Sequence, residues 1–311
     1  MNTSPRTFEI VPRGDYSLEQ GANFIGAWHR APSDTGGPEG HLHLAFLTDG
    51  ELAPVGVCIK QDTRGLVLGT VYGEAAETAD VVRQVERILS LDVDGREWPE
   101  VAKRDPVVAR LQKRFAGFRP VNWSNAYEAA AWCVISSRIS MRQGEGVKDR
   151  MSRELGHAID IHGHVLWTFV APDRLAHLEK FPGLFGRKVE YLNALGRAAL
   201  AGEVDTETLR AMPREESLNR LQRLPGIGPF GSQLVRLRAL SAVDELPSQE
   251  PRLLGAIRTE YGLASDPDQA TLERLAEKWS PYRMWVCVCL RRTLEGGSGM
   301  MHSRASQEAV S

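Results

Sequence analysis

A single carboxylate at a defined helix start is the feature of this sequence with the clearest chemical use. Residues 244–251, Asp-Glu-Leu-Pro-Ser-Gln-Glu-Pro, form a short polar stretch between two segments of helical periodicity. Proline favours the first position of a helix and pushes the preceding residue out of helical conformation, so Pro251 predicts Glu250 as the N-cap. We expect the helix N-terminus to hold this carboxylate in place and to keep it ionised.

A glycine turn lies upstream of this carboxylate, at Pro225-Gly226-Ile227-Gly228. Apolar residues have helical spacing on both sides of it, with Leu218, Leu221 and Leu224 before the turn and Leu234, Val235, Leu237 and Leu240 after it. The pattern predicts helix, tight hairpin, helix. Gly226 and Gly228 can adopt positive φ, and the second helix opens with N–H groups that suit a phosphate. All-α proteins also use such turns simply to reverse the chain, and that alternative stays open.

Hairpin and carboxylate together resemble the helix-hairpin-helix superfamily of DNA base-excision glycosylases, most closely its 3-methyladenine DNA glycosylase II branch. That branch has Leu-Pro-Gly-Ile-Gly, present here at 224–228, then an aromatic residue two positions later, then a loop that ends in a catalytic Asp. Phe230 and Glu250 match these places, the latter with Glu instead of Asp. The resemblance covers roughly residues 91–295 and includes the element Trp-x-Pro-x-Arg at 279–283.

The resemblance implies excision of alkylated purines from DNA after base flipping. A carboxylate stabilises the oxocarbenium character that develops when the N-glycosidic bond breaks, and the family assigns this work to the residue that matches Glu250. Glutamate is one methylene longer than aspartate, so either the backbone is adjusted and Glu250 is catalytic, or the protein is a weak or inactive lesion binder. Asp244 and Glu245 are fallback carboxylates, and we expect Asp244 to fix the loop backbone.

The resemblance also implies a base pocket. Phe230 stands where the family places an aromatic residue beside the flipped base, and where its glycosylase/lyase members have a lysine nucleophile. The absence of that lysine predicts a monofunctional enzyme. Leu234 and Arg291 stand where tyrosine and tryptophan are found in the family, so both are candidate pocket residues that alter substrate preference. The alternative for Phe230 is an ordinary core residue.

Contacts with DNA are expected at three places. The amides of Gly226, Ile227 and Gly228 would grip the DNA backbone, and in the family a Na⁺ or K⁺ ion often lies at the segment that corresponds to 224–229. Arg138 matches the residue that wedges into the duplex, with a surface arginine on a helix turn as the alternative. Arg187 and Lys188 at a helix start are candidate phosphate contacts, and a solvated helix start is the alternative.

Histidine and cysteine side chains are the possible metal ligands of this chain. His41 and His43 face one side of a predicted strand, and His162 and His164 flank a glycine; a solvated strand face and a turn pair are the interpretations we favour over a metal. The cysteines, Cys58, Cys133, Cys287 and Cys289, have no paired ligand spacing. They indicate a reducing compartment, no metal or redox role for Cys287 and Cys289, and, by comparison with the cluster-bearing members of the family, no iron–sulfur cluster.

Length and periodicity predict an α+β protein. Strands are expected over 41–48, 52–60 and 65–72 as an antiparallel meander, covered by an amphipathic helix over 78–90. Nearly every segment after residue 124 has helical periodicity. The predicted domains are a β-rich region at 1–115, an all-helical glycosylase-like domain at 116–295, and a disordered tail at 296–311.

The composition excludes few classes of protein function. The chain has 311 residues, 42% of them hydrophobic and 25% charged, and a net charge of −2. DNA contact would therefore depend on local patches and backbone amides. With no secretory signal and no membrane-length apolar run, we expect an intracellular protein, cytoplasmic and nucleoid-associated in a bacterium, with no membrane partner.

Three functions compete. The leading one is a monomeric, monofunctional glycosylase that acts on damaged double-stranded DNA and needs no cofactor beyond the monovalent ion. The second is a non-catalytic helix-hairpin-helix protein that binds damaged DNA, which needs the hairpin but not Glu250. The third is a helical interaction protein in which the hairpin is only a turn and DNA is not bound.

Overall fold

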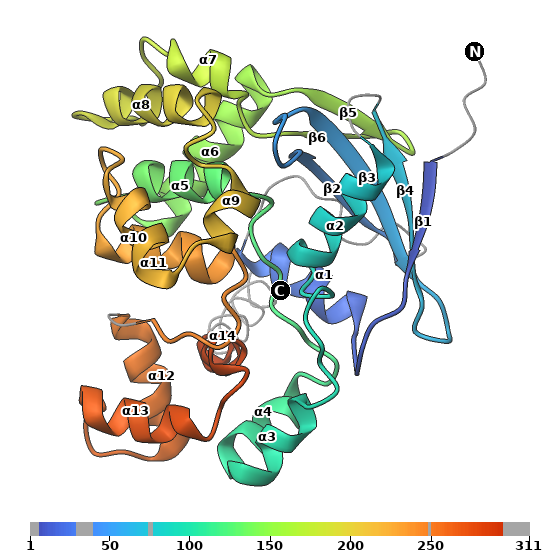
Figure 1. The fold of residues 1–311 in the computed structure, drawn as a ribbon, viewed down its shortest axis with the longest axis vertical. Helices are drawn as coiled ribbons and strands as arrows, with labels where there is room; N and C mark the ends of the chain where they lie inside the picture. The colour runs from blue at the N-terminus through green and yellow to red at the C-terminus, as the bar shows by residue number, and fades with distance from the viewer. Residues whose placement is uncertain (1–5, 29–39, 74–76, 248–249, 295–311) are drawn as a thin grey trace, which may run out of the picture.

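A sheet followed by many helices forms the fold, which confirms the predicted α+β class (Figure 1). The computed structural model describes residues 6–28, 40–73, 77–247 and 250–294. Its four-stranded antiparallel sheet has the order β1-β4-β3-β2. The strands are β1 (Arg6–Ile10), β2 (Leu42–Leu47), β3 (Pro54–Gln61) and β4 (Val67–Tyr72).

The predicted meander is confirmed as β2, β3 and β4, whereas β1 and helix α1 (Leu18–Trp28) were not predicted. Strand β1 has only five residues, of which Phe8 and Ile10 are buried, so its sequence pattern is too short to stand out. It pairs with β4, where Phe8 lies opposite Gly69. A Cβ at Gly69 would lie 2.0 Å from Cζ of Phe8, so only glycine leaves room for the ring.

Helix α2 (Thr78–Ile88) corresponds to the amphipathic helix predicted over 78–90. Its apolar face is buried, with Val81 and Val85 fully inaccessible. Arg87, also buried, forms an ion pair with Asp49 and donates to the carbonyl of Ala239 at 2.7 Å. This arginine therefore ties the sheet layer to the end of a distant helix.

Helices make up most of the chain from residue 98 onward. They are α3 (Trp98–Arg104), α4 (Pro106–Arg114), α5 (Ala126–Ser136), α6 (Met141–Leu155), α7 (Pro172–Ala176), α8 (Lys188–Leu200), α9 (Thr206–Ala211), α10 (Arg214–Gln222), α11 (Pro229–Arg238), α12 (Pro251–Tyr261), α13 (Gln269–Glu277) and α14 (Arg283–Thr293). A hairpin of β5 (Ala158–Ile161) and β6 (His164–Trp167) interrupts them and extends to the sheet (Figure 1). It packs so closely on β3 that a Cβ at Gly56 would lie 2.7 Å from Ile159.

Two large hydrophobic cores hold most of these elements together. One joins the sheet and helices α1 to α4 with the C-terminal helices α12 to α14, and it contains Trp279 and Trp285, which are fully buried. The other is built mainly from α5 to α11. The first core takes residues from both sides of residue 115, and the domain limits 1–115 and 116–295 stay a prediction.

Two further predictions concern the chain ends and membranes. The tail predicted to be disordered, 296–311, lies outside the described residues. Within the described ranges, no helix is both long enough and apolar enough to cross a bilayer.

Candidate active site between helices α11 and α12

Helices α10 and α11 and the turn between them confirm the predicted helix, tight hairpin, helix. Leu218, Leu221, Leu224 and Ile227 are buried, and the last three anchor the turn in the second core. Only Gly226 uses the left-handed region, with φ +89°, whereas Gly228 has φ −94° and is the N-cap of α11. The expectation of positive φ is therefore wrong for Gly228.

The two glycines also differ in the space around them. A Cβ at Gly226 would lie 2.6 Å from Cδ2 of Tyr191, so this position excludes any side chain. A Cβ at Gly228 would meet nothing within 4 Å. Gly228, Pro229 and Phe230 are exposed, and no side chain caps the start of α11. The turn therefore presents an open, uncapped helix N-terminus, which is a site that suits an anion.

Glu250 is the N-cap of α12, as predicted. Its side chain makes no capping hydrogen bond, so the expectation that the helix N-terminus holds the carboxylate is wrong. Glu250 Oε1 instead lies 2.7 Å from Nε of Arg291 on α14, and the two side chains are 24% and 13% exposed. An ion pair between two helices, rather than a cap, sets the direction of this carboxylate.

The pKa of Glu250 is raised above its ordinary value because burial penalises the charged form. The cations Arg291, Arg238 and Arg252 act in the opposite direction, Arg291 most strongly. Arg238, at the end of α11, is a site residue that the sequence interpretation missed. It is 7% exposed and donates to the carbonyl of Val121 at 2.6 Å. Its helical spacing among apolar residues is a signal that it points inward.

The fallback carboxylates have structural partners. Asp244 accepts hydrogen bonds from Ser280 at 2.9 Å and from Nη1 of Arg283 at 2.6 Å. Glu245 forms an ion pair with Arg236 at 2.6 Å and contacts Arg214. Both therefore fix the loop between α11 and α12 against neighbouring helices. Residues 248–249, just before Glu250, lie outside the described residues.

The candidate pocket residues lie on α11 and α14. Phe230 is 58% exposed, so the alternative of an ordinary core residue is wrong for it. Leu234, one helical turn further along α11, is half-buried, as is Arg291. This region thus presents an exposed phenylalanine at the start of α11 and a partly buried carboxylate at the start of α12. The pocket role of all three residues stays a prediction.

The basic candidates for DNA contact differ in their surroundings. Arg138 is exposed in the turn between α5 and α6 and has φ +57°. Arg187 is exposed, pairs with Glu190 at 2.8 Å and lies over the ring of Tyr191. Lys188, by contrast, is 8% exposed, and its Nζ donates to the carbonyl of Ile135 at 2.8 Å. Its ammonium is turned inward to the end of α5, away from any phosphate outside.

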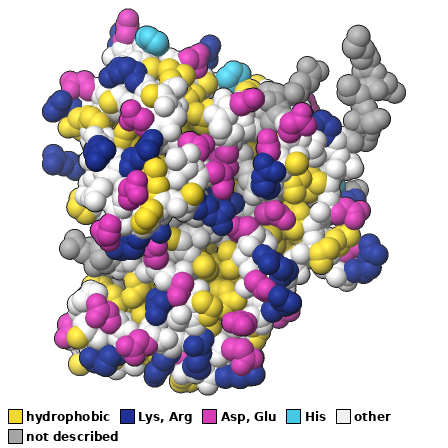
Figure 2. Space-filling model, in the orientation of Figure 1, with side chains coloured by type: hydrophobic (Ala, Val, Ile, Leu, Met, Phe, Trp, Pro, Cys, Tyr) yellow, Lys and Arg dark blue, Asp and Glu magenta, His cyan; other side chains and the backbone are white. Residues whose placement is uncertain are grey.

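Charge on the visible face is mixed. Figure 2 shows Lys and Arg side chains interspersed with Asp and Glu side chains over this face, without a broad region of one sign. This distribution agrees with the net charge of −2. Long-range attraction to a polyanion is therefore weak, and local groups must supply the contacts.

One of the histidines, His43, does not lie on a solvated strand face. His43 is 2% exposed, which contradicts the interpretation favoured from the sequence. His41, His43, Cys58 and His162 form a cluster whose ligand atoms all lie within 4.8 Å of one another. The remaining cysteines are Cys133, half-buried in α5, and Cys287 and Cys289, both buried in α14.

Comparison with known proteins identifies the fold. No family model matches the chain. The DNA-3-methyladenine glycosylase of Bacillus subtilis is 23% identical over 219 residues, which are 69% of this chain and 72% of that protein. A 3-methyladenine DNA glycosylase from Archaeoglobus fulgidus superposes with a TM-score of 0.76 at 20% identity, covering 91% of this chain and 97% of that one.

A second solved structure shares the fold. The 8-oxoguanine glycosylase/lyase of Clostridium acetobutylicum, in complex with double-stranded DNA, superposes with a TM-score of 0.66 at 16% identity, covering 93% of this chain and 94% of that one. The two solved structures share the overall fold of this chain across more than nine-tenths of its length. The chain therefore has the fold of these DNA glycosylases, and its sequence is similar to that of a bacterial DNA-3-methyladenine glycosylase.

Proposed function

We propose that the protein is a monofunctional DNA glycosylase that hydrolyses the N-glycosidic bond of alkylated purines of the 3-methyladenine type, with Glu250 as the catalytic carboxylate. The observation that carries the proposal is the position of Glu250. It is a partly buried carboxylate at the start of α12, in the loop that follows the α10–α11 hairpin. The names of the Bacillus subtilis and Archaeoglobus fulgidus relatives support the substrate class.

Glu250 acts in its ionised form. Positive charge develops on the deoxyribose as the glycosidic bond lengthens, and a fixed carboxylate stabilises this charge and orients the attacking water. An alkylated purine leaves as a neutral base, so no separate acid is required. Arg291 keeps the carboxylate ionised despite its burial and holds it in one direction. The interhelical pair thereby compensates for the longer side chain of glutamate.

DNA is bound through the turn and through exposed basic side chains. The amides of Gly226, Ile227 and Gly228 contact phosphate, and the hairpin segment 224–229 would hold a Na⁺ or K⁺ ion that adds positive charge beside the DNA backbone. Arg138 enters the duplex when the damaged base is extruded, and its exposure in the α5–α6 turn supports that role. Phe230, also exposed, stacks on the extruded base. The protein acts as a monomer inside the cell.

The reaction ends at an abasic site, without strand cleavage. A lyase step needs an amine nucleophile, and Phe230 occupies the place where lyase members of the superfamily have a lysine. Borohydride treatment of a mixture with abasic DNA is the direct measurement. A covalent protein–DNA complex would contradict this part of the proposal.

The second candidate function is non-catalytic binding of damaged DNA. One observation favours it, because the ion pair with Arg291 neutralises the charge of Glu250 and a neutralised carboxylate stabilises a developing cation less well. The two functions differ in one respect only. The glycosylase releases free base, whereas the binding protein does not.

The deciding experiment measures release of free base from alkylated duplex DNA by wild type and by Glu250→Gln. We expect the glutamine variant to lose activity by about 100-fold or more, because the transition state loses its counter-charge. Affinity for lesion DNA should be kept. The matched control is Glu277→Gln, which changes an exposed glutamate of α13 and should be as active as wild type.

Each outcome decides between the candidates. Release by wild type and by Glu277→Gln, but not by Glu250→Gln, supports the catalytic role. Binding of lesion DNA by wild type without any release leaves the non-catalytic protein. Absence of both binding and release would remove DNA from the function altogether.

A further inference from the structure

We propose that His41, His43, Cys58 and His162 form a structural zinc site that fixes the β5–β6 hairpin to the N-terminal sheet. The site is independent of the glycosylase chemistry, and it uses residues from two consecutive strands of the sheet and from a turn that lies far from them in the sequence. His41 immediately precedes β2, His43 lies on β2, Cys58 lies on β3, and His162 lies in the β5–β6 turn.

The geometry of the four ligand atoms supports this assignment. All of them lie within 4.8 Å of one another. Sγ of Cys58 and Nδ1 of His41 are 3.4 Å apart. Zn–N bonds of about 2.0–2.1 Å and Zn–S bonds of about 2.3 Å place the ligand atoms of a tetrahedral site about 3.3–3.6 Å apart. The cluster therefore needs only a small contraction to surround one ion.

The ligand types select the metal. Three imidazoles and one thiolate are nitrogen and sulfur donors of the kind that zinc takes in closed tetrahedral sites, and they include no carboxylate or carbonyl that would favour Mg²⁺ or Ca²⁺. On binding, the thiol of Cys58 gives its proton to solvent and the zinc ion gives up its bound waters. No redox step is involved.

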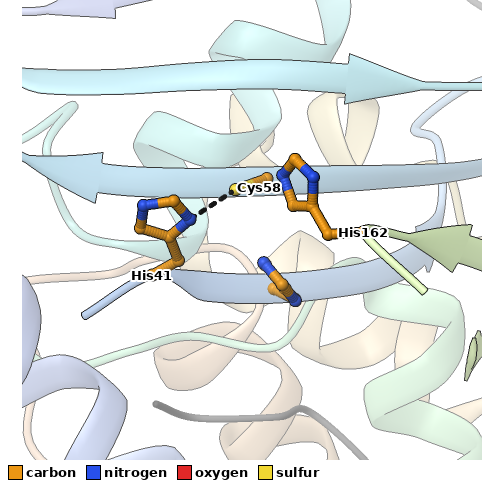
Figure 3. A group of neighbouring side chains, drawn as sticks. His41, Cys58 and His162 are labelled. Atoms are coloured by element: carbon orange, nitrogen blue, oxygen red, sulfur yellow. Dashed lines mark hydrogen bonds between the residues drawn. The ribbon is translucent and has the colours of Figure 1, made fainter. Parts of the chain in front are cut away.

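The exposure and the neighbouring contacts of the four residues suit a metal site. His43 and Cys58 are buried, whereas His162 is exposed, so an ion can enter from the hairpin side. Figure 3 shows His41 and His162 on opposite sides of Cys58, with His162 contributed by the hairpin. Nε2 of His162 lies 3.0 Å from the hydroxyl of Tyr72 on β4, and this contact orients the ring over the sheet.

The β5–β6 turn presents His162 in an unusual way. His162 has φ +55° and Gly163 φ +83°, so both central residues of this two-residue turn are left-handed. Asn or Asp is the usual first residue of such a turn. In this protein a histidine takes that place, and Asp160 tightens the turn by accepting the N–H of Gly163 at 2.8 Å. The backbone thus holds His162 where its ring reaches the sheet.

The consequence of zinc binding is mechanical. Beside the cluster, Cys58, Ile161 and Leu166 form a small hydrophobic core that joins hairpin and sheet. A core of this size gives little stability by itself. A metal that links residue 41 to residue 162 closes a long chain segment and adds the binding free energy to folding. Zinc would therefore hold the β5–β6 hairpin, which interrupts the helices, against the N-terminal sheet.

The test uses untagged full-length protein, stripped with a chelator and then given one equivalent of zinc. We expect wild type to retain one zinc per chain after gel filtration, measured by atomic emission, and to gain thermal stability with the metal. His162→Asn removes one ligand while keeping a residue that suits the turn, and Cys58→Ser removes the thiolate. Both should lose stoichiometric zinc and the metal-dependent rise in melting temperature.

The matched control is His164→Ala. The ring of His164 lies 5.7 Å from that of His43, yet His164 is not a member of the cluster. This variant should retain zinc like wild type. Cobalt in place of zinc adds a spectroscopic readout, since wild type and His164→Ala should show thiolate-to-cobalt absorption that Cys58→Ser lacks. Failure of wild type to retain zinc, or equal retention by His162→Asn and Cys58→Ser, would overturn the proposal.

Discussion

The candidate active site and the histidine–cysteine cluster are assembled in opposite ways. Hairpin, loop and Glu250 come from one continuous stretch, 214–261, so their order along the chain already brings them close together. The cluster takes ligands from β2, β3 and the β5–β6 turn, which only the tertiary fold brings together. A continuous motif can thus be recognised in a sequence, whereas a discontinuous ligand set looks like scattered surface histidines.

Even within the continuous motif, the local sequence determines the backbone positions but not the partners of the side chains. The positions of the turn and of the N-cap follow from proline and glycine, which restrict the backbone locally. The partner of Glu250 is Arg291, which lies on another helix. Mutations that separate local from tertiary contributions test this distinction, and we expect the largest effect at Glu250 itself and the smallest at the start of α8.

Glu250→Asp tests whether the site is built for the longer side chain. Shortening the residue moves the carboxylate by about an ångström or more and breaks the contact with Arg291, so base release should fall by about 100-fold. Single-turnover release of free base is the measurement. Activity equal to or above that of wild type would show that the loop is shaped for aspartate and that the Arg291 pair is incidental.

Gly226→Ala tests whether DNA binding depends on the backbone conformation of the crowded position at Gly226. The substitution places a Cβ 2.6 Å from Tyr191 at φ +89°, so we expect affinity for DNA to fall by about 10-fold as the turn is distorted. Gly228→Ala is the matched control because its Cβ would meet nothing within 4 Å. Fluorescence anisotropy with labelled duplex measures both. Equal affinities of the two variants would argue against binding of a DNA phosphate by the backbone amides of this turn.

Arg291→Gln tests the tertiary partner of Glu250. The carboxylate must be ionised to act, and its pKa is raised, so activity is present above that pKa and is lost as pH falls through it. Arg291 lowers this pKa, and its removal should move the acidic limb of the pH–rate profile to higher pH. Arg252→Gln, which removes a weaker influence, should move it less. A limb that does not move in Arg291→Gln would exclude Glu250 as the titrating group.

The smallest effects are expected for Lys188→Met and Arg187→Gln. Lys188 donates to the carbonyl of Ile135, so its loss should lower the free energy of unfolding by about 1 kcal/mol with unchanged affinity for DNA. Arg187 is exposed, and its loss should leave stability unchanged while reducing the salt slope of DNA binding by about 1. Urea denaturation and salt titrations measure the two effects. The reverse pattern would assign the phosphate contact to Lys188.

The sequence by itself determined the local features of this protein. Alternating and helical periodicities predicted β2 to β4, α2 and the helix pair α10–α11, because each element buries one face that recurs at a fixed spacing. Pro251 placed Glu250 at the start of α12, since proline limits the backbone of its own residue and of its neighbour.

Only the tertiary structure decided which side chains meet. It joined strand β1 to the sheet, turned Lys188 inward, paired Glu250 with Arg291, and gathered three histidines around Cys58. None of these contacts leaves a periodic trace in the sequence, because each joins residues whose separation along the chain is arbitrary. Burial and charge then act between groups that the fold brings together, and only their coordinates show which groups those are.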